Sequence, residues 1–229
     1  MNAVSNIWNN LDWTIPLKLI LGVVPSLICI TLHELSHGYV AYLLGDPTAK
    51  NAGRLTLNPI RHIDPMGLLM MLVFHFGWAK PVPVNMYYFR RPRRDMALTA
   101  LAGPAANLVI GIVFLFLYGL LYAPLKGSGS VDWLLETVYL TAYISLALMV
   151  FNIIPISPLD GSKVLYSFLP EDTYVKLMRY ERYGMIILFA LVAGGVLGSP
   201  VSTAVGWVFD KLFVIAQWGF DLYKVLSGL

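Results

Sequence analysis

The sequence predicts an all-α polytopic membrane protein with about five transmembrane helices and a short re-entrant or hairpin segment. Of its 229 residues, 58% are hydrophobic and only 13% are charged, and the mean hydropathy is +0.69. A soluble domain of this size needs more polar surface to cover its core. Several long stretches lack Asp, Glu, Lys and Arg altogether, which is typical of helices that cross a bilayer.

Five apolar segments are long enough to be considered as spans. The first ends at the Gly, Pro and Asn breakers of "GDPTAKNAG". The last two are separated by "GGVLGSP", and Asp210 and Lys211 interrupt the final one, so an interfacial amphipathic helix is the alternative there. The expected spans are residues 15–44, 97–125, 133–159, 183–197 and 201–226.

The distribution of Lys and Arg predicts the orientation. Eight of the sixteen basic residues lie between Asp46 and Asp95, which places the 46–95 loop in the cytoplasm and the N-terminus outside. Beside apolar spans, this cluster indicates membrane orientation rather than a nucleic-acid partner. The 14-residue segment 66–79 is too short for an ordinary crossing, and a crossing would put basic residues on both sides, so a dip is favoured.

The remaining general features predict one integral-membrane domain over residues 1–229. The N-terminus shows neither a basic region nor a small-residue cleavage site typical of a signal peptide. The single cysteine, Cys29, excludes an internal disulfide framework and is interpreted as a small buried hydrophobe.

The first span contains "HELSH" in the middle of an apolar helix. His33 and His37 are one turn apart on the same face, so both imidazoles can bind one metal ion. Glu34 is rotated by about 100° from His33, where it can take a proton from a water bound to that ion. The two histidines lie about 16 and 10 Å along the helix from its cytoplasmic end, so the site is inside the bilayer.

Such a site needs a third protein ligand, and Asp160 in "NIIPISPLDGSKVL" is the candidate. It is the only acid between Thr137 and Pro170, and it follows the prolines Pro155 and Pro158. Broken backbone at membrane depth is tolerated where it lines a cavity. The alternative role for Asp160 is to cap a helix at the interface.

Together these residues resemble the site-2 protease family of intramembrane zinc metalloproteases. The resemblance rests on "HELSH" and on "NIIPISPLDG", while "GRLTLNPIRHIDPMG", "GWAKPVPVN" and "LAGPAAN" look like the small bacterial and archaeal branch without PDZ or CBS domains. It covers a catalytic core of about residues 15–169, whereas the C-terminal helices at about 183–226 are not diagnostic. It implies hydrolysis of peptide bonds in or near transmembrane segments of other membrane proteins, in the cytoplasmic membrane of a prokaryote.

The resemblance also implies roles for individual residues. His33, His37 and Asp160 would bind one Zn²⁺ ion, and Glu34 would be the general base that later protonates the leaving amine. Asn152 matches an asparagine that steadies the substrate backbone or the oxyanion. Asn107 in "GPAAN" is assigned to the same role, with a simple tie between two helices as its alternative.

Several alternatives remain open at the level of the sequence. A catalytically inactive scaffold or chaperone of the same fold is one, although all four key residues are intact, and a zinc transporter is another, although the later helices carry no series of ligands. His62 and His75 lack i+4 partners and are expected to be structural. The segment 68–85 either offers a strand edge to an unwound substrate or packs as a plug beside the first helix.

Overall fold

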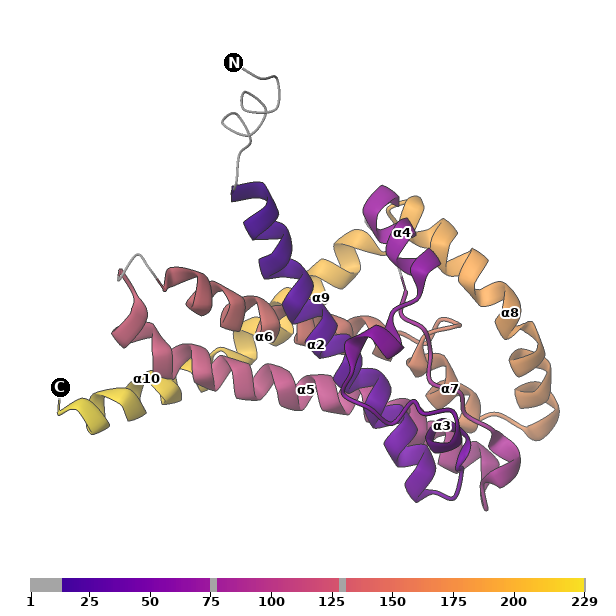
Figure 1. Cartoon of the computed structure of the whole chain (residues 1–229). Coiled ribbons are helices and arrows are strands. Elements are labelled where there is room, and N and C mark those ends of the chain that lie inside the picture. Colours follow the sequence, from indigo (N-terminus) through magenta and orange to yellow (C-terminus); the bar gives the residue numbers. More distant parts are fainter. Residues whose placement is uncertain (1–13, 75–77, 128–130, 229) are drawn as a thin grey trace.

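The computed structural model describes residues 14–74, 78–127 and 131–228, and every regular element in these ranges is a helix. This confirms the all-α prediction. Helices α5 (Pro92–Leu125), α6 (Asp132–Ile153) and α10 (Val214–Ser227) run side by side, and α2 (Thr14–Leu43) crosses them obliquely, as Figure 1 shows. The core between α5, α6 and α9 (Gly198–Leu212) is formed by buried apolar side chains: Leu115, Ala142, Leu146, Met149 and Phe209.

Helix α2 is the element that carries the two histidines of "HELSH". Its 30 residues agree with the predicted span 15–44 and correspond to a length of about 45 Å. The helix ends where the Asp46 amide bonds the Ala41 carbonyl and Gly45 adopts a φ of +107°, a conformation that glycine adopts without steric cost. The chain then turns through α3 (Thr48–Asn51) and the short helix η1 (Pro59–His62).

The segment between η1 and residue 79 forms a loop whose two ends lie side by side. Its outgoing arm is the ten-residue helix α4 (Pro65–Phe74), which at about 15 Å is too short to cross a bilayer. The two ends meet because Ile63 and Ala79 form an isolated antiparallel bridge, and the Lys80 amide donates to the His62 carbonyl at 2.9 Å. The chain continues without regular secondary structure to η2 (Met86–Tyr88), and Asn85 just before it has extended dihedral angles.

Helix α10 packs closely against the second half of α5. A Cβ atom on Gly119 would lie 1.7 Å from the Ala216 carbonyl oxygen, and one on Gly219 would lie 2.2 Å from the Phe116 carbonyl oxygen. Small residues at such crossings let helix backbones approach in membrane proteins. The aromatic contacts Tyr118–Phe213 and Tyr122–Phe220 advance together along both helices, so α10 runs parallel to α5.

The third predicted span is shorter in the structure than in the prediction. Helix α6 ends at Ile153, and after a non-helical stretch the chain starts α7 (Asp160–Ser167). Gly161 permits this turn, because a Cβ there would lie 2.0 Å from the Ile153 carbonyl oxygen.

The C-terminal helices also differ from the predicted ranges. Helix α8 (Glu171–Ala193) begins before the predicted span 183–197 and includes the charged residues 171–182. The last predicted helix is divided at Phe213 into α9 and α10.

Three helical segments within the described residues are long and apolar enough to span a membrane. They are α5, α6 and the combined α9–α10 unit over Gly198–Ser227, while Tyr183–Ala193 within α8 is a shorter apolar helix. The structure therefore describes a polytopic helical membrane protein, and the predicted count of five spans is not confirmed.

Candidate metal centre

His33 and His37 face the same buried position from consecutive turns of α2. Their exposed fractions are 7% and 9%, and their Nε2 atoms are 3.0 Å apart. The two rings are nearly perpendicular, with an interplanar angle of 85°. The i, i+4 spacing read from the sequence thus brings two imidazole nitrogens to one point.

Asp160 approaches this point from the first residue of α7. Its Oδ2 atom lies 3.1 Å from His33 Nε2 and 3.2 Å from His37 Nε2. The carboxylate faces the histidines, and the N-cap position of α7 is Leu159, without a side-chain capping bond. The proline-broken stretch before α7 therefore brings together residues that are 127 positions apart in the chain.

The opposite nitrogen of each imidazole contacts helix α5. His37 Nδ1 lies 2.7 Å from the Thr99 carbonyl oxygen, which can only accept, so Nδ1 carries the proton and Nε2 keeps its lone pair. His33 Nδ1 lies 3.0 Å from the side-chain amide of Asn107, which is fully buried. The Asn107 Oδ1 atom has no hydrogen-bond partner among the described residues.

The orientation of the Asn107 amide decides the tautomer of His33. Amide oxygen and nitrogen are assigned from their hydrogen bonds, and a half-turn of this amide would place the unpaired Oδ1 against His33 Nδ1. The oxygen would then accept the Nδ1 proton and leave Nε2 of His33 as a lone-pair donor. This arrangement is the usual one behind histidine ligands of a metal.

The three ligand atoms fit a zinc ion. Their separations of 3.0, 3.1 and 3.2 Å are close to the about 3.3–3.4 Å between ligand atoms that zinc bonds of about 2.0–2.1 Å produce in a tetrahedron. Gly103 of α5 leaves a cradle beside them, since a Cβ there would lie 2.4 Å from His37 Nε2 and 2.6 Å from His33 Nε2. Two histidines, one carboxylate and an open position are a common donor set of catalytic zinc.

Glu34 lies next to the histidines in α2 and contacts the non-helical segment that precedes η2. Its Oε2 atom accepts a hydrogen bond from the Val82 amide at 2.9 Å. We call residues 79–85 the strap. It is held at both ends, because Arg54 Nη2 donates to the Lys80 carbonyl at 2.6 Å and the Asn85 amide donates to Asp46 Oδ2 at 2.6 Å.

The structure separates the other candidates from the cluster. Asn152 donates to the Leu148 carbonyl on its own helix at 2.9 Å. His62 is 1% exposed, and its Nε2 lies 2.9 Å from the Thr56 carbonyl oxygen, as expected for a packing residue. His75 lies outside the described residues.

Sequence reasoning missed four residues around the cluster. Thr99 and Gly103 of α5 contact the histidines, and Asp46 and Arg54 hold the strap. The only signal for them was position: Gly103 stands in "LAGPAAN", and Asp46 and Arg54 stand in the breaker-rich stretch after the first span.

Comparison with known proteins identifies relatives over most of the chain. The model of peptidase family M50 matches residues 125–194, which include Asn152 and Asp160. The Bacillus subtilis protein named "Putative zinc metalloprotease YwhC" is 38% identical over 187 residues, covering 81% of this chain and 83% of its own. The Mycobacterium tuberculosis H37Rv protein named "Putative zinc metalloprotease Rip2" is 31% identical over 190 residues, covering 80% and 71%.

An archaeal relative and the solved structures complete the comparison. The Methanocaldococcus jannaschii protein named "Putative zinc metalloprotease MJ0611" is 35% identical over 101 residues, or 44% of this chain and 49% of its own. No solved structure matches. Because the Bacillus subtilis and Mycobacterium tuberculosis relatives each span about four fifths of its length, the chain belongs to peptidase family M50, the site-2 proteases, and is a zinc-dependent membrane peptidase.

Proposed function

We propose that this peptidase hydrolyses peptide bonds in or near the transmembrane segments of other membrane proteins. The observation that carries the proposal is the cluster of His33, His37 and Asp160, buried where α2 meets the apolar helix α5. His33 and His37 lie ten and six residues before the end of α2 at Leu43, or about 15 and 9 Å along its axis. A substrate whose peptide bond enters the membrane can reach this depth.

In this proposal His33, His37 and Asp160 hold one zinc ion, and Thr99 and Asn107 fix the orientation of the two rings. When bound, zinc supplies Lewis acidity, which lowers the pKa of water and polarises a carbonyl group. The cluster lies among buried side chains, where ionisable groups are costly without partners, and this favours a functional role.

Glu34 acts as the general base and acid. It takes a proton from the water that attacks the scissile carbonyl carbon, and it gives a proton to the amine nitrogen as the C–N bond breaks. Its hydrogen bond from the Val82 amide fixes the orientation of the carboxylate beside the histidines before substrate arrives. Asn152 would contact the substrate backbone or the oxyanion after releasing the Leu148 carbonyl.

The strap is the proposed contact for an unwound substrate backbone. Its backbone is non-helical, with an antiparallel bridge at Ala79 and extended dihedral angles at Asn85, and its Val82 amide donates directly to Glu34. Main-chain pairing with such a segment would present a peptide bond that a helix conceals.

We propose a single membrane domain over residues 1–229 with its core at about 15–169. In this proposal α2 also crosses the membrane, in addition to the three spans α5, α6 and α9–α10. The N-terminus lies outside, and the 46–95 loop lies in the cytoplasm of a prokaryote. Because α10 runs parallel to α5, both helices end on the same side. This arrangement leaves α8 on the cytoplasmic side, where Figure 1 shows it lying across the direction of α5. It gives four crossings rather than five.

The test is cleavage of a reporter membrane protein by the purified enzyme in liposomes, with Glu34→Gln as the variant. We expect Glu34→Gln to retain zinc and to lose at least about 100-fold in cleavage rate, since general base catalysis contributes about 10²–10⁴-fold. Zinc content by mass spectrometry is the control for the site itself. Unchanged cleavage by zinc-loaded Glu34→Gln would contradict the mechanism, and substrate binding without cleavage by the wild type would indicate a scaffold.

A further inference from the structure

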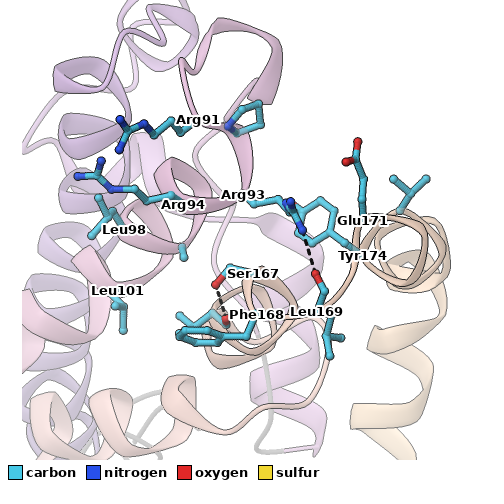
Figure 2. A pocket seen from close by; sticks show the side chains of 14 residues that line it. Arg91, Arg93, Arg94, Leu98, Leu101, Ser167, Phe168, Leu169, Glu171 and Tyr174 are labelled. Atoms are coloured by element: carbon cyan, nitrogen blue, oxygen red, sulfur yellow. Dashed lines mark hydrogen bonds between the residues drawn. The ribbon is translucent and has the colours of Figure 1, made fainter.

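A cavity outside the metal centre lies beside the first turns of α5, where Arg91, Arg93 and Arg94 are found. It has a volume of about 800 Å³, and it is bounded by the first turns of α5 and by the junction of α7 with α8 (Figure 2). This volume is in the range of pockets that hold a small molecule. Arg93 Nη1 donates to the Leu169 carbonyl at 2.9 Å, which ties the two walls together.

The rim of this cavity is positively charged. Arg91, Arg93 and Arg94 line it, with Glu171 as the only acid among the lining residues, so the lining carries a net charge of +2 (three minus one). None of these arginines forms an ion pair with a carboxylate in the part of the chain that the structure covers. Asp95 is not available to pair with these arginine side chains, because it is buried and its Oδ2 accepts the Arg91 backbone amide at 3.0 Å.

The lower wall of the cavity is apolar. Leu98 and Leu101 follow the arginines along α5 (Figure 2), and Val164 of α7 and Phe168, the residue that follows α7, also line the cavity. Leu101, Val164 and Phe168 also line a smaller cavity of about 260 Å³, whose lining includes Asp160. A basic rim above a continuous apolar wall fits a ligand with an anionic head and a hydrocarbon tail.

The position of the cavity matches the edge of a bilayer. Arg94 and Asp95 are the last charged residues before a run of uncharged ones that extends to Leu125. Leu98 and Leu101 lie about 6 and 10 Å below Arg94 along the helix, which is the direction from a headgroup into the acyl region. Anionic lipids are enriched in the cytoplasmic leaflet and attract basic residues close to its surface.

We propose that this cavity binds an anionic membrane phospholipid, with its phosphate at Arg91 and Arg94, whose side chains extend to the same side in Figure 2, and one acyl chain along Leu98, Leu101 and Phe168. The bound lipid joins α5 to α7, the helix that begins at Asp160. An acidic segment of a protein partner would use the arginines but would leave the apolar wall uncovered. The combination of both surfaces in one cavity therefore favours the lipid.

The experiment is native mass spectrometry of the full-length protein in detergent, titrated with phosphatidylglycerol or with phosphatidylcholine of the same acyl chains. We expect the wild type to prefer phosphatidylglycerol by at least tenfold. The double variant Arg91→Gln, Arg94→Gln should bind it about 30-fold more weakly, which corresponds to about 1 kcal/mol for each basic residue. Arg93 is left intact because it bonds Leu169.

Matched variants separate the lipid from other occupants. Lys50→Gln, Arg61→Gln removes the same charge from exposed positions outside the cavity and should keep the preference. Leu98→Asn should weaken phosphatidylglycerol binding, and inorganic phosphate should not displace the lipid. Equal binding of the two lipids would overturn the proposal, as would an equal loss in the control, displacement by inorganic phosphate, or displacement by an acidic peptide.

Discussion

Gly103 is the residue that leaves room beside the two histidines. A methyl group there would lie within 2.4–2.6 Å of both Nε2 atoms, in the space where their lone pairs would meet a cation. We therefore expect Gly103→Ala to lower the zinc content of the purified protein by more than tenfold. Gly22→Ala on α2 is the control, because a Cβ there meets nothing within 4 Å, and full zinc occupancy of Gly103→Ala would show that the ion does not use this space.

Asn107 offers a test of how His33 is oriented. If Oδ1 accepts the Nδ1 proton, Asn107→Asp preserves an acceptor and should bind zinc better than Asn107→Leu, which removes it. The leucine variant should lose about 10–100-fold in zinc affinity, as is usual when the partner of a histidine ligand is removed. Competition with a chelator measures both affinities. Equal losses in the two variants would indicate that the amide donates to Nδ1 instead.

The sequence could predict the ligand candidates but not their surroundings. His33, Glu34 and His37 are neighbours in one helix, so their relation follows from 3.6 residues per turn. Asp160 was marked by its isolation as an acid and by the prolines before it. The contacts of Thr99 and Asn107 with the rings depend on where α5 crosses α2, and no local pattern encodes a crossing point.

Among the elements, the strap is the one that contacts Glu34, the proposed general base, through the Val82 amide. Asp46 is fully buried and holds it by accepting the Asn85 amide, while its other oxygen accepts from the Thr48 amide and hydroxyl. We expect Asp46→Ala to destabilise the protein by about 2–4 kcal/mol, since it leaves three half-buried donors of Thr48 and Asn85 unpaired. It should slow cleavage while zinc stays bound.

Limited proteolysis within the strap, together with thermal unfolding, measures this effect. Asp172→Ala is the control, because Asp172 is exposed on α8. Protease resistance equal to that of the wild type would mean that Asp46 does not hold the strap.

Element boundaries show where local sequence signals fail. The start of α5 was placed at residue 97, after the charges, but the helix begins at Pro92, because proline is favoured in the first turn and the Asp95 carboxylate accepts the Arg91 amide there. The fourth span was predicted to begin at residue 183, but the helix extends back through the charged residues 171–182, and both stretches form the single helix α8. Charge changes the environment of a helix without ending it.

At the scale of the whole molecule, the proposed topology rests on the parallel course of α5 and α10. Five crossings from an outside N-terminus would leave it in the cytoplasm. Four crossings leave it outside, together with the loop after α5, because α10 follows α5 in direction. Hydropathy could not distinguish these counts, since the apolar end of α8 resembles a short span in composition.

Cysteine labelling distinguishes the two topologies. The natural Cys29 is fully buried and should give little background with a membrane-impermeant maleimide. We expect Tyr87→Cys, at a position that is 97% exposed, to react only in inverted vesicles. Lys126→Cys and Ser227→Cys should both react in right-side-out vesicles, because the ends of α5 and α10 face the same side. Reaction of Ser227→Cys on the side of Tyr87→Cys would restore an odd number of crossings and require α8 to span the membrane.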